Sequence, residues 1–169
     1  MAITRLGGAN AISGTIPQGN IANASLGAVT ALPAAITTGK VLQVVTNATN
    51  GTTQTSSTSF VDTSLTANIT PSSTSNKILI LVSANCEANN TTAYVTVARG
   101  GTNIGSSGGF AITQVANSSI PAHHSYYDSP SSTSSLTYTV QIRNNDGGNT
   151  MTFNSQNPKS SITLMEIAG

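Results

Sequence analysis

Hydrophobic and polar residues alternate with a period of two along much of the chain after residue 39. In the clearest example Leu65, Ala67 and Ile69 are each followed by a polar residue, and Pro71 ends the pattern. Successive side chains of a strand point to opposite faces of a sheet, so this alternation predicts a half-buried strand. Similar or more apolar runs predict strands at residues 40–45, 77–86, 93–101, 110–116, 120–127, 136–143, 151–155 and 161–168.

The most apolar of these runs, KILILVSANC at residues 77–86, predicts a central strand that is buried on both faces. Turn-forming residues separate the strands: the Gly100-Gly101 pair predicts a tight turn, and the SSGG, DSPSSTSS and NNDGGN segments predict loops. Many short strands without helices between them are typical of antiparallel sandwiches. We therefore predict that residues 40–169 form an all-β domain, an antiparallel β-sandwich with jelly-roll-like topology.

Residues 1–39 follow neither a strand period nor a helix period, and Pro17 and Pro33 interrupt any regular element. The segment is nevertheless rich in aliphatic residues. We predict an extended N-terminal docking arm or linker; the alternative is a flexible leader. The side chains expected to anchor the arm to a partner are Ile3, Leu6, Ile12, Ile16 and Ile21.

The composition narrows the classes of protein that fit. Ser, Thr and Asn make up 66 of the 169 residues, only 7% of residues are charged, and the formal net charge is +1. Six basic residues against five acidic ones provide no surplus for nucleic-acid binding. No stretch approaches the length of apolar sequence that would insert into a membrane, and no signal-peptide core is evident. A surface with so little charge predicts a protein whose faces and edges are covered in an assembly.

Catalytic and metal-binding patterns are missing. The five carboxylates are scattered through the sequence, and neither a nucleophile elbow nor a phosphate-binding loop occurs. The only cysteine, Cys86, lies in an apolar run, which predicts a buried and inert thiol. We predict a protein that is not an enzyme, with no catalytic residues, no cofactor and no metal site.

The adjacent pair His123-His124 and the nearby Tyr126 and Tyr127 are the candidate ligand-binding residues. Aromatic side chains can stack on sugar rings, so these four are candidates for contact with a receptor glycan; core or cross-strand packing is the alternative. Consecutive strand residues face opposite sides, so His123 and His124 cannot readily chelate one metal ion together. One histidine from each subunit of a symmetric oligomer could still converge on a shared ion.

Five segments together resemble a β-sandwich module of structural proteins in marine tailed bacteriophages, particularly cyanophages. In order along the chain they are GKVLQVV (39–45), TSFVDTSLTANITPSSTSNKILILVS (58–83), ARGGTNIG (98–105), YYDSPSSTSSLTYTVQIR (126–143) and SITLMEIA (161–168). Modules of this kind form distal parts of tail fibres, head fibres or capsid decorations, generally as trimers joined to the particle by an N-terminal segment. The family has no catalytic residues to carry over.

The resemblance implies a non-enzymatic virion component on the surface of the phage particle, made in the host cytoplasm. Its expected partners are two further copies of itself in a homotrimer and other virion proteins. The alternative is a tail-associated carbohydrate-binding protein that recognises a host-surface glycan. The short N-terminal part favours a compact knob held on the particle over a long fibre, and attachment to head or tail stays open.

Overall fold

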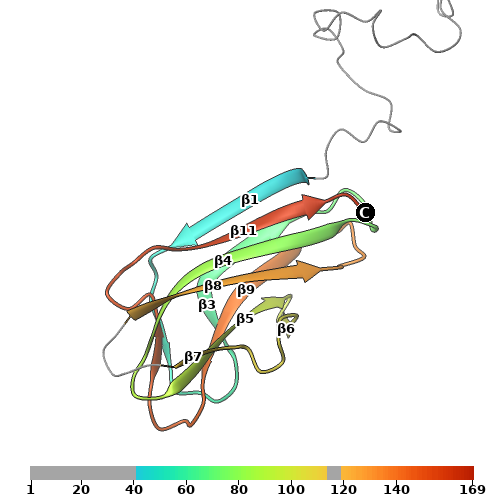
Figure 1. Cartoon of the computed structure of the whole chain (residues 1–169). Helices are drawn as coiled ribbons and strands as arrows, with labels where there is room; N and C mark the ends of the chain where they lie inside the picture. Colours follow the sequence, from blue (N-terminus) through green and yellow to red (C-terminus); the bar gives the residue numbers. More distant parts are fainter. Residues whose placement is uncertain (1–40, 114–118) are drawn as a thin grey trace, which may run out of the picture. The chain divides into compact units, whose positions relative to one another are not determined.

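Two antiparallel sheets make up residues 41–113 and 119–169, the part of the chain that the computed structural model describes (Figure 1). No helix occurs in these residues. The strands are β1 (Val41–Thr49), β2 (Thr53–Thr55), β3 (Val61–Ile69), β4 (Lys77–Ala88), β5 (Thr92–Arg99), β6 (Thr102–Asn103), β7 (Phe110–Thr113), β8 (Ser119–Asp128), β9 (Leu136–Asn144), β10 (Met151–Phe153) and β11 (Ser160–Ile167).

Sheet A contains β1, β11, β4 and β8 in that order, and Figure 1 shows these four strands side by side in one layer. The short strands β10 and β2 extend the sheet beyond the end of β11. Sheet B has the order β3, β9, β5, and both β6 and β7 pair with the free edge of β5. The chain therefore passes repeatedly from one sheet to the other, which is the jelly-roll arrangement of two interlocked Greek keys.

The core lies between the two sheets and is built from alternate residues of their strands. Among its largest buried side chains are Leu65, Ile80, Tyr138, Phe153 and Leu164. Each is flanked along its strand by more exposed positions. Residues 140–142 of β9 depart from this alternation, because all three are buried. The period-two pattern of the sequence therefore describes the side chains that form the core, and the predicted all-β sandwich is confirmed.

The prediction that residues 77–86 form a strand buried on both faces is wrong, because β4 is buried on one face only. Ile78, Ile80 and Val82 point into the core, whereas Leu79 is partly exposed and Leu81 is 38% exposed. A strand is buried on both faces only when another layer packs on each face of its sheet. In a two-sheet sandwich each sheet has a layer on one face only. The second apolar set of this strand is left on the outside of sheet A.

The tight turn predicted at Gly100-Gly101 is confirmed. Both glycines have positive φ angles, 55° and 82°, and they join β5 to β6 with Arg99 opposite Thr102. A two-residue hairpin loop with left-handed backbone at both positions matches the twist of the strands, and glycine adopts this backbone without steric cost. The turn thereby fixes the end of β5, where Arg99 lies.

The predicted arm, with Ile3, Leu6, Ile12, Ile16 and Ile21, lies outside the described residues. Within the described part of the chain there is no helix long and apolar enough to cross a membrane.

Candidate binding surface

We call the outward-facing side of β1, β11, β4 and β8 the open face. It carries a continuous apolar row. The register aligns Val44 with Met165, Met165 with Leu79, and Leu79 with Tyr127. Residues directly opposite each other in paired strands share one face of the sheet, so these four side chains cross all four strands. Ile80, the neighbour of Leu79, points into the core, which places the row on the outside of the sandwich.

Most of the exposed large hydrophobic side chains of the described residues lie on this face. Five of the seven exposed large hydrophobic side chains lie in or beside the row: Val41, Leu42, Val44, Leu81 and Tyr127. Val44 is 55% exposed and Tyr127 is 64% exposed. Single exposed hydrophobic residues are ordinary on protein surfaces, but a contiguous apolar patch on a sheet marks a contact surface.

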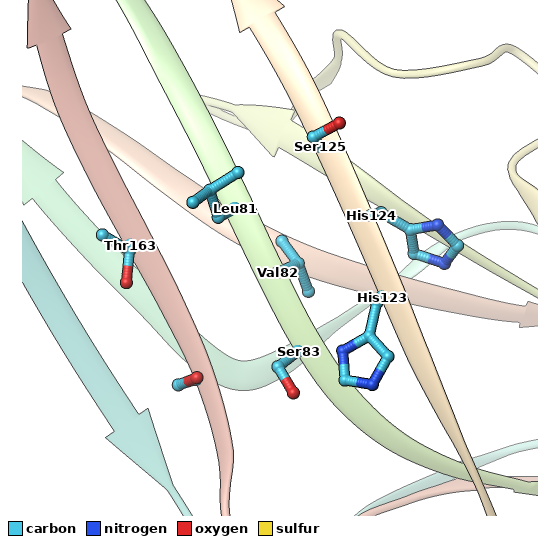
Figure 2. A pocket seen from close by; sticks show the side chains of 8 residues that line it. Leu81, Val82, Ser83, His123, His124, Ser125 and Thr163 are labelled. Carbon is cyan, nitrogen blue, oxygen red and sulfur yellow. The ribbon is translucent and has the colours of Figure 1, made fainter.

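Hydroxyl-bearing side chains occupy the part of the open face beyond the apolar row. They line a depression of about 390 Å³ whose walls are formed by Leu81, Val82, Ser83, His123, His124, Ser125, Ser161 and Thr163. Figure 2 shows Leu81 and Ser83 on β4 between Thr163 of β11 and the β8 residues Ser125 and His123. The hydroxyl groups of Ser83, Ser125, Ser161 and Thr163 are neutral hydrogen-bonding groups, and Leu81 adds an apolar side chain.

Charge is nearly absent from the open face. Among the outward-facing residues of its four strands, the only Lys, Arg, Asp or Glu side chains are Lys77 and Glu87. They lie at opposite ends of β4, ten residues and therefore about 34 Å apart. The face thus has one basic end and one acidic end, with uncharged surface between them.

The four candidate glycan-contact residues are divided between two sides of β8. His123 and Tyr127 are exposed on the open face, whereas His124 and Tyr126 are half-buried and turned toward sheet B. The ring of Phe110 on β7 stacks on His124 with a centroid distance of 4.0 Å and meets Tyr126 edge-on at 5.6 Å. The structure therefore does not bring the four side chains together on one surface.

The histidine pair has the geometry expected of consecutive strand residues. Burial lowers the pKa of His124, and the neighbouring His123 lowers it further, so an uncharged imidazole stacks on Phe110. Within residues 41–113 and 119–169, no three His, Cys, Asp or Glu side chains are grouped so that they could hold a metal ion.

Asp128 belongs to a clamp between the two sheets. Arg99 at the end of β5 donates from Nη1 to both carboxylate oxygens, at 2.8 and 2.6 Å, and the Tyr138 hydroxyl of β9 donates to Oδ2 at 2.7 Å. Burial, reinforced by the adjacent carboxylate, raises the pKa of Tyr138, so this phenol stays protonated and donates. Asp128 is therefore engaged in holding sheet A to sheet B.

Glu166 is the buried carboxylate of a second network, and it is 1% exposed. Its Oε2 accepts a hydrogen bond from Gln43 of β1 at 2.6 Å, and Oε1 accepts from the backbone N–H of Ser72, the Ser72 hydroxyl and Asn76 at 2.5–2.8 Å. Burial alone would raise the pKa of Glu166, but these donors stabilise the charged form and lower it to about 2. The carboxylate therefore stabilises the ends of β1 and β11 and the loop before β4.

Cys86 is fully buried in the core, and burial raises the pKa of its thiol to about 12. Because the thiolate is the reactive form, we expect native protein not to react with a thiol-specific reagent such as DTNB at pH 8. Unfolding in guanidinium chloride should release one equivalent of thiol per chain. Rapid labelling of the native protein would contradict the burial of this side chain.

The signal for the apolar row is present in the sequence, although the same pattern predicts a strand that is buried on both faces. Leu79 and Leu81 alternate with Ile78 and Ile80, so two apolar sets run in opposite phases along one strand. One set fills the core and the other forms part of the open face.

Comparison with known proteins adds no assignment: no protein-family model and no curated protein matches this chain.

Proposed function

We propose that this chain is a non-enzymatic structural component of a bacteriophage virion, a surface fibre or decoration protein anchored by its N-terminal arm. The observation that carries the proposal is the open face, an apolar and almost uncharged surface on a jelly roll whose carboxylates serve as structural acceptors. Such a surface suits a protein that is covered by copies of itself or by other proteins in a permanent assembly.

The assignment to a phage particle rests on the ordered resemblance of five segments to marine phage structural modules. The expected partners are accordingly other virion proteins and two further copies of this chain in a homotrimer. Attachment through residues 1–39 is supported by the aliphatic content of that segment and its interrupting prolines. A head decoration, a head fibre and a tail fibre all use the same two parts, a docking arm and a stable sandwich.

Labelling of purified particles tests the role and its location together. Antibodies against residues 41–169, carrying gold, are expected to mark intact virions of the phage that encodes the chain, at the head surface or at the tail. A copy beginning at residue 40 should keep an all-β circular dichroism spectrum but fail to join the particle. Unlabelled virions would contradict the structural role, and incorporation of the shortened copy would contradict anchoring by the arm.

A second candidate function is recognition of a host-surface glycan. It is favoured by one observation, the hydroxyl-lined depression on the open face with His123 in its wall and the exposed ring of Tyr127 on the same strand. Hydroxyl groups and an aromatic ring are the usual contacts for a neutral sugar. Binding on a glycan array that is lost in both His123→Ala and Tyr127→Ala would support this function over a purely structural one.

A further inference from the structure

We propose that the open face of sheet A is the surface through which copies of this chain contact each other. The inference goes beyond the proposed function, since it assigns a pairwise contact between two copies to one face of one sheet. The row formed by Val44, Met165, Leu79 and Tyr127 would lie inside the contact. The other side of the sandwich has no comparable set of exposed large hydrophobic side chains among the described residues.

The size of the open face is adequate for a specific contact. Four strands spaced about 4.8 Å apart and about nine residues long give a surface of about 19 by 30 Å. One copy would therefore contribute about 600 Å², which is the low end of the range for stable protein interfaces. The apolar centre and the hydroxyl-bearing surroundings also match the usual distribution of residues in an interface, with a hydrophobic centre and a polar rim.

The two charged residues of the face favour another copy of this chain as the occupant. Lys77 and Glu87 have opposite charges and lie at opposite ends of β4. When the Lys77 end of one copy lies on the Glu87 end of the next, each charge meets its complement. When two equivalent ends meet, like charges are brought together. The face is thus complementary to itself when the strands of two copies run in opposite directions, which is a twofold contact between two copies. A homotrimer would need a further contact elsewhere on the chain.

Charge introduced into the row tests the location of the contact. Val44→Glu and Tyr127→Glu place a carboxylate at the two ends of the row, at positions already 55% and 64% exposed in the single chain. We expect each variant to fold and to weaken association by about a hundredfold, because the interface would bury an unpaired charge. Thr137→Glu, at an exposed position of β9 on the outside of sheet B, is the matched control and should associate like the unmodified chain.

Exchange of the two charges tests the identity of the partner. In the full-length chain, Lys77→Glu and Glu87→Lys should each weaken self-association by about tenfold, and the double variant should recover most of that loss. Recovery requires that both residues contact another copy of the same chain. A different protein would keep its original charges, so the double variant could not restore the pairing with it. Sedimentation velocity on the full-length protein measures the association state of each variant, and circular dichroism verifies its fold.

Three results would overturn the inference. The first is an unmodified chain that sediments as a monomer, and the second is association of Val44→Glu and Tyr127→Glu like that of the unmodified chain. The third is a double charge variant that associates no more tightly than the weaker of its two single variants. Association that is lost on removing residues 1–39 but kept in the face variants would assign the contact to the N-terminal segment. An oligomer that depends on the open face yet is absent from virions would refute the proposed function and leave this inference standing.

Discussion

Replacing Arg99 with methionine is expected to lower the free energy of unfolding by about 3 kcal/mol. The side chain of Asp128 is only 10% exposed, and loss of the guanidinium leaves its carboxylate with the Tyr138 hydroxyl as its remaining partner. Removing one member of a buried ion pair typically costs about 3–5 kcal/mol, and we take the lower value because Arg99 is 30% exposed. Urea denaturation monitored by circular dichroism measures the change.

The double variant Arg99→Met with Asp128→Asn is the control for this prediction. Removing the charge of Asp128 relieves the penalty of an unpaired carboxylate, so the double variant should be more stable than the sum of the two single losses predicts. A coupling energy near zero would show that the two side chains do not stabilise the sandwich as a pair. The pair joins β5 of sheet B to β8 of sheet A, so its loss should also increase hydrogen exchange at the ends of those strands.

Replacing Glu166 with glutamine is expected to destabilise the protein by about 3 kcal/mol at pH 7. The carboxylate accepts four hydrogen bonds, and an amide would set its own donor against at least one of these N–H or O–H groups. The same substitution should remove an acid-sensitive contribution to stability. Guanidinium denaturation at a series of pH values measures both effects.

The sign of the pH effect follows from the lowered pKa of Glu166. Its value is about 2 in the folded chain and about 4.3 in an unfolded chain, so the unfolded state binds the proton more tightly. The stabilisation is fully present above about pH 5 and is lost as the pH falls through 4 toward 2. Unmodified protein should therefore lose stability across this window, and Glu166→Gln should lose much less.

Asp62→Asn serves as the control for that experiment. The Asp62 carboxylate is exposed on β3 of sheet B, where it accepts a hydrogen bond from Nε2 of Gln141 at 2.7 Å. Its replacement should change the stability at pH 7 much less than Glu166→Gln does, because water can solvate the groups that lose a partner. An equal loss in the two variants would refute the special role of the buried network.

Sequence alone located nine of the eleven strands of the described chain, and the reason is the period of two. The side chains that fill the core, such as Leu65 and Ile162, recur at every second position, and turn residues separate the runs. The two strands that were not predicted, β2 and β6, have three and two residues and are too short to show a period. They exist because neighbouring strands offer backbone partners to them.

Tertiary pairing also extended β1 beyond the predicted end at residue 45. The sequence of residues 46–49 is typical of a turn, yet these residues pair with β11 as far as Thr49. Asn47 also donates from Nδ2 to the Thr66 carbonyl of β3 at 2.6 Å. A ladder of backbone hydrogen bonds outweighs the weak local preference of Thr and Asn for turns. The side-chain amide then satisfies a carbonyl of the strand in the other sheet.

By itself the sequence determined that the protein is all-β and where nine of the eleven described strands lie, because those features depend on residues that are close along the chain. It could not determine the two carboxylate networks, since Glu166 meets donors 90 or more residues away and Asp128 meets Arg99 from the opposite sheet. Nor could it assign Leu79 and Leu81 to the outside of the protein. An apolar run has the same pattern whether its second face meets another layer or remains open, and only the arrangement of the two sheets decided that it remains open.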